Sequence, residues 1–239
     1  MKSVFQKITI VFLTIFFLSF ATPVKKVTIW MIGDSTMASK KPERKPESGW
    51  GVEFAQFVKN GVVVKNKAAS GRSTKSFIAE KRWKAVLDSI KPGDFVIIQF
   101  GHNDQRKDSL VYADANTTYK ELLKKYIKET REKGGKPVIC TPVVRRHFDG
   151  NGNLLDTHGD YLKVVRTVAG ETKTPLVDME ALTRKLVTDL GTEKSKDLFT
   201  MRKNGLDSTH LCHAGALQVA ELFVKNAKKQ HLKIARYFK

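Results

Sequence analysis

The sequence contains little cysteine. Among 239 residues there are two cysteines, Cys140 and Cys212, with no C-x-x-C motif and no Cys/His spacing typical of zinc sites. A chain of this length can bury a sizeable core without disulfide bonds. A bridge between the two cysteines is one interpretation, but we expect two buried thiols because the domain does not need the bridge.

The composition also lacks the bias of fibrous, disordered or polytopic membrane proteins. Hydrophobic residues make up 41% and charged residues 28% of the chain, close to the average of soluble globular proteins. This excludes a collagen, a disordered tail and a protein with several membrane spans.

One apolar run stands out, at Ile8 to Phe20, and it follows the basic residues Lys2 and Lys7. It is shorter than the ~20 apolar residues of a membrane span and ends in a small-x-small pattern at Ala21. We therefore expect residues 1–21 to be a cleaved signal peptide and residues 22–239 to form a single domain that is periplasmic or secreted. The alternative is an uncleaved anchor.

Basic residues outnumber acidic residues in this chain. There are 43 Lys and Arg against 24 Asp and Glu, a net charge of +19. Removal of residues 1–21 takes away two lysines, which leaves 41 basic residues and a charge of +17. Such a surplus indicates contact with nucleic acid, anionic lipid or an acidic polysaccharide. Export makes nucleic acid the least favoured of these partners. The alternative, which the net charge alone does not exclude, is a basic surface that is simply solvated.

Short apolar runs alternate with amphipathic stretches along the chain. This order predicts an α/β fold in which helices cover both faces of a five-stranded parallel sheet, with no internal repeat and no linker. The predicted strands are Val27–Gly33, Val62–Asn66, Asp94–Phe100, Pro137–Thr141 and Pro175–Asp178. The predicted helices are Trp50–Asn60, Ser76–Ile90, Thr117–Lys133, Tyr161–Ala169, Ala181–Leu190 and Ala214–Lys228. Segments Lys40–Glu47 and Asp149–Asp156 have the composition of surface loops.

Ligands of open parallel sheets bind beyond the carboxyl ends of the strands, so the residues that follow each strand are the first candidates. Ser35 follows the first strand, Gly71 the second and Asn103 the third. Asp207 and His210, three residues apart, lie before the last helix, where a tight turn would let the carboxylate hold the imidazole. A nucleophile, an oriented base and nearby N–H donors are what acyl transfer requires.

Each of these elements is weak by itself. A serine after a strand is most often a helix cap, and Asp-x-x-His is usually a turn or cap pair. Their joint placement at one sheet edge favours catalysis. The sequence lacks the G-x-S-x-G motif of the α/β-hydrolases around Ser35, because Met37 stands where the second glycine would be.

At this point the chain resembles a known family. Its blocks Gly33-Asp34-Ser35, Gly71, Gly101-x-Asn103-Asp104 and Asp207-x-x-His210 are similar, in order and spacing, to the four blocks of the SGNH (GDSL-type) hydrolases. The chain resembles one group of this superfamily, the rhamnogalacturonan acetylesterases, more closely still. The further residues that carry this resemblance are Thr36, Gly49-Trp50-Gly51, Asn66-x-Ala68-x-Ser70 to Thr74, Gln99 to Asp104, Thr141-Pro142-Val143 and His158 to Tyr161.

The resemblance implies a flavodoxin-like three-layer α/β/α fold and metal-free hydrolysis of acetyl esters on pectin. It implies that Ser35 is the nucleophile, His210 the base and Asp207 its orienter. It also implies an oxyanion hole made of the Ser35 N–H, the Gly71 N–H and the Asn103 amide. Of the arginines, Arg72 and Arg146 are candidates for pairing with substrate carboxylates, although a solvated or internally paired arginine is as common.

The expected partner is thus an acetylated acidic plant polysaccharide, pectic rhamnogalacturonan. We expect no cofactor, no metal, no nucleic acid and no stable membrane insertion after signal cleavage, and we expect a monomer. Two alternatives stay open. The first is another SGNH esterase, namely a xylan or sialate acetylesterase, a lipase or a thioesterase. The second is a catalytically inactive module that binds polyanions.

Overall fold

A central sheet of five parallel strands organises the molecule, which a computed structural model describes for residues 26–239. The strand order is β2-β1-β3-β4-β5. The strands are β1 (Thr28–Gly33), β2 (Val63–Asn66), β3 (Phe95–Gln99), β4 (Lys136–Cys140) and β5 (Leu176–Val177). The five strands predicted from the sequence are confirmed to within a residue or two at each end. The predicted signal peptide lies outside the described residues.

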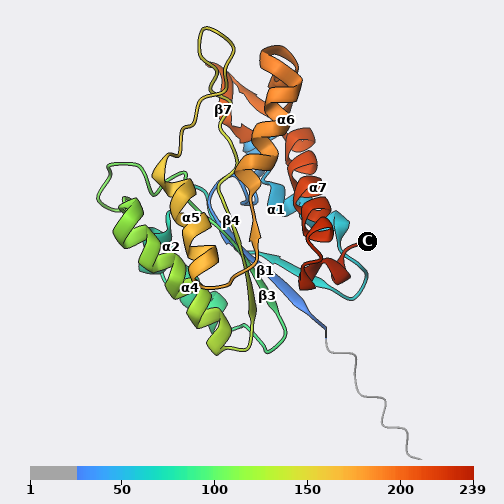
Figure 1. The fold of residues 1–239 in the computed structure, drawn as a ribbon. Coiled ribbons are helices and arrows are strands. Elements are labelled where there is room, and N and C mark those ends of the chain that lie inside the picture. Colours follow the sequence, from blue (N-terminus) through green and yellow to red (C-terminus); the bar gives the residue numbers. More distant parts are fainter. Residues whose placement is uncertain (1–25) are drawn as a thin grey trace, which may run out of the picture.

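Helices cover both faces of this sheet, so the molecule has three layers (Figure 1). One face carries α2 (Thr74–Ala79), α3 (Arg82–Leu87), α4 (Lys120–Glu132) and α5 (Asp160–Glu171). The other carries α1 (Trp50–Glu53), α6 (Met179–Lys194) and α7 (His213–Lys229). The predicted α/β/α architecture is therefore confirmed. None of the helices in residues 26–239 has the length and apolar character needed to cross a membrane.

Strand β1 shows why the apolar runs are continuous rather than alternating. Ile29 and Met31 pack into the core on the α7 side of the sheet, whereas Trp30 and Ile32 pack into the core on the α4 side. All four side chains are almost fully buried. A strand covered on both faces needs apolar residues at every position, which is the pattern seen in the sequence.

Two predicted helices differ from the observed ones. The stretch predicted as one helix from Ser76 to Ile90 is two short helices, α2 and α3, separated by Lys81 in a left-handed conformation with φ of 57°. Helix α2 also begins earlier, because Ser73 and Ser76 form a reciprocal capping box. The stretch predicted from Trp50 to Asn60 is the single turn of α1 followed by a 3-10 turn at Phe54–Phe57. Apolar periodicity indicates which residues face the core. Two short helices can place the same residues against the core as one long helix, so the periodicity does not reveal the break.

A two-stranded antiparallel hairpin was not predicted. It consists of β6 (Phe199–Arg202) and β7 (Gly205–Leu211), and it stands beyond the end of the sheet near the start of α7 (Figure 1). Asp207 and His210 lie in β7, in the part where the register with β6 is irregular, and not on an isolated turn as the sequence suggested. The turn contacts are nevertheless present, because the Asp207 side chain accepts the N–H groups of Thr209 and His210.

The two cysteines are unpaired. Cys140 is fully buried in β4, and its burial raises the pKa of the thiol far above its usual value. Cys212 is only partly buried and donates its S–H to the carbonyl of Asp197 at 3.0 Å. The expectation of free thiols is confirmed for both cysteines, and that of burial for Cys140.

Asp104 ties the loop after β3 to the start of α2. Its Oδ1 accepts the backbone N–H of Thr74 at 2.9 Å and the Thr74 hydroxyl at 2.5 Å. Its Oδ2 is buried without a partner, and burial raises the pKa of this carboxyl from 3.8 to about 7. At neutral pH a substantial share of the folded molecules therefore carries Asp104 as the neutral acid.

This raised pKa predicts a pH-dependent contribution to stability. Between about pH 4 and pH 7 the unfolded chain loses the Asp104 proton while the folded chain retains it, so stability falls as pH rises through this window. The full effect is on the order of a few kcal/mol. We expect the unfolding free energy of the wild type, relative to that of Asp104→Asn, to fall from pH 5 to about pH 7 and to level off above it in denaturant titrations. A difference that stays constant over this range would contradict the buried, unpartnered Oδ2.

Candidate active site

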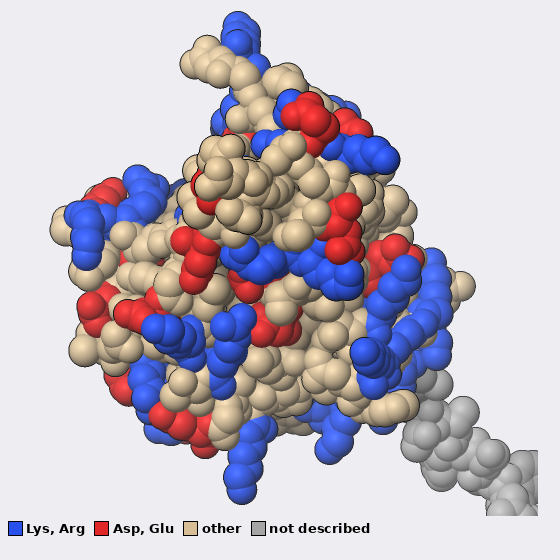
Figure 2. Space-filling view, turned by 45° about the horizontal axis from the view of Figure 1, so that its top comes forward, with Lys and Arg blue, Asp and Glu red and all other residues tan. Residues whose placement is uncertain are grey.

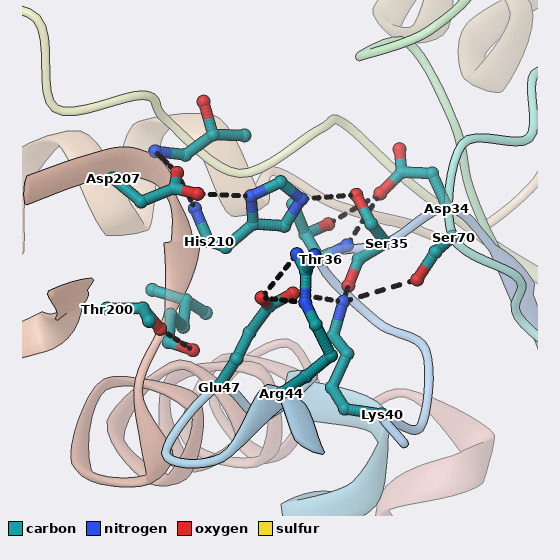
Figure 3. Close-up of polar contacts among 12 residues, drawn as sticks. Asp34, Ser35, Thr36, Lys40, Arg44, Glu47, Ser70, Thr200, Asp207 and His210 are labelled. Carbon is teal, nitrogen blue, oxygen red and sulfur yellow. Dashed lines mark hydrogen bonds and ion pairs between the residues drawn. The ribbon is translucent and has the colours of Figure 1, made fainter. Parts of the chain in front are cut away.

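Three side chains from distant parts of the chain form a hydrogen-bonded row (Figure 3). The Nε2 atom of His210 lies 2.9 Å from the Ser35 hydroxyl, and its Nδ1 atom lies 2.8 Å from Oδ2 of Asp207. Ser35 follows β1, whereas the other two residues belong to β7. The structure thus brings together the three residues that the sequence predicted as nucleophile, base and orienter.

Asp207 is held by more than the histidine. Its Oδ1 accepts the backbone N–H groups of Thr209 and His210, both at 2.9 Å, and its Oδ2 also accepts from Nε of Arg202. Burial works against ionisation, but these hydrogen bonds outweigh it and hold the pKa of Asp207 far below its usual value. The group is therefore a carboxylate at neutral pH and fixes the orientation of the imidazole ring.

The loop that carries Ser35 is fixed from beneath by a chain of buried hydrogen bonds. Trp50 Nε1 donates to Gln99 Oε1 at 2.7 Å, and Gln99 Nε2 donates to the Thr36 hydroxyl at 2.8 Å. That hydroxyl and the Thr36 N–H both donate to Asp34 Oδ1. Every member of this chain is buried. The residues next to the nucleophile are thus connected to the end of β3 and to α1.

Glycines allow α1 to approach this loop closely. A Cβ on Gly49 would lie 2.3 Å from the carbonyl oxygen of Ala38, and one on Gly51 would lie 2.7 Å from the Asn66 amide nitrogen. Both contacts are far shorter than real Cβ contacts. Gly49 and Gly51 on either side of Trp50 are therefore explained by packing against the nucleophile loop.

The predicted oxyanion donors gather around the same serine. Ser35, Gly71 and Asn103 all line one cleft with His210. Within residues 26–239 the N–H groups of Ser35 and Gly71 donate to no protein acceptor, whereas the Asn103 amide donates to the Arg72 carbonyl at 3.1 Å. Gly71 has a φ of +80°, a conformation that favours glycine. These three groups are free or weakly engaged donors from residues that line the same cleft.

A second buried group lies behind the serine. His102 Nδ1 is 3.3 Å from Asp34 Oδ2, and its ring packs edge-to-face against His158 at 4.7 Å. Burial lowers the pKa of both histidines, so both are neutral imidazoles at neutral pH. The carbonyl of His102 accepts from the Arg145 guanidinium at 3.0 Å. His102 lines the cleft, and among residues 26–239 it has no hydrogen bond to Ser35.

The cleft has a volume of about 850 Å³, and most of its charged side chains are cationic. Seven lysines and arginines line it, against two glutamates, Glu43 and Glu47. The seven are Lys40, Lys41, Arg44, Arg72, Arg82, Arg106 and Arg145. The space is large enough for several sugar rings, and its electrostatic character suits an anionic ligand.

The two arginines proposed from the sequence as substrate contacts differ in position. Arg72 lines the cleft, but its Nε is paired with the Glu80 carboxylate at 3.0 Å. Arg146 is not among the residues that line this cleft, and its Nε donates to the Ser195 hydroxyl at 2.8 Å. The backbone N–H of Arg146 instead donates to the Ser208 carbonyl at 2.8 Å, between Asp207 and His210. The structure therefore gives Arg146 a place in supporting the hairpin.

Three charged residues at the site were missed by the sequence reasoning: Lys40, Glu47 and Arg202. Lys40 and Glu47 are in a segment predicted to be a surface loop, yet both side chains turn inward and lie 2.8 Å apart, with exposures of 6% and 1%. Arg202 is at the end of β6 and donates to both Asp207 and Glu47. The only local signal was the run of charges itself, which has the composition of a solvated loop.

Taken by chemistry alone, the site contains the parts that nucleophilic acyl transfer requires. A serine hydroxyl faces an imidazole, a carboxylate orients the imidazole, and backbone and amide N–H groups lie beside the serine. Ser35 and His210 both line the cleft.

Known proteins with the same organisation were found by sequence and by structure. Residues 31–216 match the GDSL-like Lipase/Acylhydrolase family. The chain is 36% identical to the rhamnogalacturonan acetylesterase RhgT of Bacillus subtilis over 86% of this chain and 91% of that one. It is 28% identical to the rhamnogalacturonan acetylesterase of Emericella nidulans over 83% of each chain.

Among solved structures, the YxiM protein of Bacillus subtilis superposes with a TM-score of 0.78 at 28% identity, over 88% of this chain but only 58% of that longer one. The acetylxylan esterase Axe2 of Geobacillus stearothermophilus shares the fold, with a TM-score of 0.61 at 22% identity over 83% of this chain and 93% of that one. The match to the family spans most of the described residues and includes Ser35 and His210. The chain belongs to the GDSL-like lipase/acylhydrolase family and is a carboxylic ester hydrolase.

Proposed function

We propose that this protein is an exported serine esterase that removes O-acetyl groups from pectic rhamnogalacturonan. The observation that carries the proposal is the row Ser35–His210–Asp207, of which Ser35 and His210 line a cationic cleft. Support for the substrate comes from the rhamnogalacturonan acetylesterases, which are 36% and 28% identical to this chain over most of its length. Support for export comes from the signal-like pattern of residues 1–21.

In the proposed mechanism, neutral His210 takes the Ser35 proton as Oγ attacks the acetyl carbonyl carbon. The carbonyl oxygen becomes an oxyanion that the N–H groups of Ser35 and Gly71 and the Asn103 amide stabilise. The imidazolium then gives its proton to the departing sugar oxygen, and an acetyl-serine remains. Water, deprotonated by His210, attacks this ester and releases acetate and free Ser35.

The charge of the protein favours an acidic polymer over a neutral one. Figure 2 shows Lys and Arg side chains in several groups over one face of the molecule, with Asp and Glu between them. On that face the basic side chains are spread out, whereas seven lysines and arginines line the cleft together with Ser35. Rhamnogalacturonan carries a carboxylate in each repeat, whereas a xylan backbone is uncharged. A cationic cleft assists capture of the first polymer and offers nothing specific to the second.

The nucleophile can be tested directly. Ser35→Ala should remove turnover of p-nitrophenyl acetate almost entirely while the protein stays folded, because no acyl-enzyme can form. A fluorophosphonate should label the wild type at Ser35, as mass spectrometry of the peptides would show. Labelling at another serine, or full activity in the variant, would exclude Ser35 as nucleophile.

The proposed role of Asn103 in the oxyanion hole can be tested by kinetics. Asn103→Ala should lower kcat by about 10²–10³-fold with little change in KM, since the amide is needed in the transition state more than in the ground state. Steady-state kinetics on p-nitrophenyl acetate would measure both constants. A change confined to KM would make Asn103 a substrate-binding residue.

Salt should separate the polymer from a small neutral ester. The kcat/KM for acetylated rhamnogalacturonan should fall with added NaCl, because the Debye length shortens from ~10 Å at 0.1 M to ~3 Å at 1 M. The kcat/KM for p-nitrophenyl acetate, which has no charge, should stay nearly constant. Parallel responses of the two substrates would show that the basic surface plays no part in capture.

A further inference from the structure

The carboxylate of Glu47 is buried beside the catalytic row and is surrounded by cations. Its side chain is 1% exposed, with Lys40 at 2.8 Å from Oε1 and both Arg44 and Arg202 at 2.8 Å from Oε2 (Figure 3 shows the first two). Burial disfavours its charge, but the hydrogen bonds from Lys40 and Arg44 outweigh this and keep the pKa of Glu47 below its usual value. Glu47 is therefore an ionised anchor for three cationic side chains.

The backbone around Glu47 is attached to the strand that carries the base. Glu47 forms an antiparallel bridge with Cys212, the Ser48 N–H donates to the Leu211 carbonyl, and the His213 N–H donates to the Pro46 carbonyl. These contacts begin one residue after His210. The anchor is thus fixed relative to the end of β7.

Arg202 connects this anchor to the orienting carboxylate. One of its terminal nitrogens donates to Glu47 Oε2 at 2.8 Å, while its Nε donates to Oδ2 of Asp207, the same oxygen that accepts from His210. The terminal nitrogen also lies 3.3 Å from His210 Nδ1. A planar guanidinium can bridge two carboxylates in this way, which a lysine cannot do with the same geometry.

We propose that Arg202, held by Glu47, is a positioning residue that fixes the Asp207 carboxylate in the place from which it orients the His210 imidazole. The proposal rests on the proposed role of His210 as base. Other charged or titratable groups near His210 are Asp207, Glu47 and His102, which reach it from β7, from the loop before α1 and from the loop after β3. Arg202, unlike these groups, is a permanent cation, and it contacts both members of the Asp207–His210 pair.

Arg202→Met removes both the bridge and the charge. We expect kcat for p-nitrophenyl acetate to fall about tenfold or more, because Asp207 loses one of its fixed partners, while KM changes less than twofold.

Arg202→Lys keeps the charge and loses the planar fork. It should give a kcat below the wild-type value but above that of Arg202→Met, because one ammonium group can still contact one of the two carboxylates. The conservative variant thus restores part of the rate, as a positioning role requires.

Arg184→Met is a matched control. Arg184 pairs with the nearly buried Glu180 at 2.6 Å and is 30% exposed, close to the 32% of Arg202, but it lies on α6 away from the cleft. This variant should keep the wild-type kcat and pH profile. Circular dichroism and thermal unfolding of all three variants would show that each is folded.

The proposal is overturned if Arg202→Met has the kcat of the Arg184→Met control, or if its kcat falls and Arg202→Lys restores none of the loss. The second result would show a merely structural role. Failure of the proposed triad has a separate signature, since Ser35→Ala would then retain turnover and both proposals would fall. If Ser35→Ala is inactive and Arg202→Met keeps the wild-type kcat, only the proposed role of Arg202 is overturned.

Discussion

The site depends on a chain of buried hydrogen bonds from Trp50 through Gln99 and Thr36 to Asp34. A serine on a free loop would sample many positions, and each misplacement of its hydroxyl would cost rate. Here the loop is joined to β3 and α1 by polar groups that have no access to water. Breaking one link would leave buried donors or acceptors unpaired, a cost of about 1–3 kcal/mol per group. Ser35, the proposed nucleophile, is thus positioned by interactions that also join α1 to the end of β3.

His210, the proposed base, reaches the site from a separate element. The β6–β7 hairpin places His210 over the end of the sheet, and the Arg202–Glu47 ion pair and the backbone bridge to Cys212 attach that hairpin to the loop that precedes α1. Both halves of the site therefore meet around α1 and the loops on either side of it. Such buried ion pairs contribute little net stability, but they require their partners to take one geometry. A catalytic arrangement benefits from that uniqueness more than from added stability.

The sequence predicted the parts of this account that rest on local patterns. Residues of β1 are buried on both faces, so their apolar run was readable, and Ser35, Gly71 and Asn103 could be placed at one edge because parallel strands end there. The split between α2 and α3 at Lys81 was not predictable, because the same residues face the core with or without the break. The hairpin was missed because β7 has few apolar residues.

The ion pairs that Glu47 forms with Lys40 and Arg202 could not be predicted from the sequence for a different reason. Arg202 and Glu47 are 155 positions apart, and each lies in a segment whose local composition resembles a solvated loop or an ordinary strand end. A lysine, an arginine or a glutamate in such a segment is most often exposed. Only the folded arrangement shows that Lys40 and Glu47 turn inward.

The most direct test of the account is the rate of acetate release from intact acetylated polysaccharides. Purified enzyme lacking residues 1–21 would be compared on rhamnogalacturonan and on acetylated xylan at equal ester concentration and low salt, with Ser35→Ala as the blank. The account predicts faster release from rhamnogalacturonan and none above background with the variant. Faster release from xylan would contradict the acidic substrate, and release by Ser35→Ala would contradict the catalytic role of the serine.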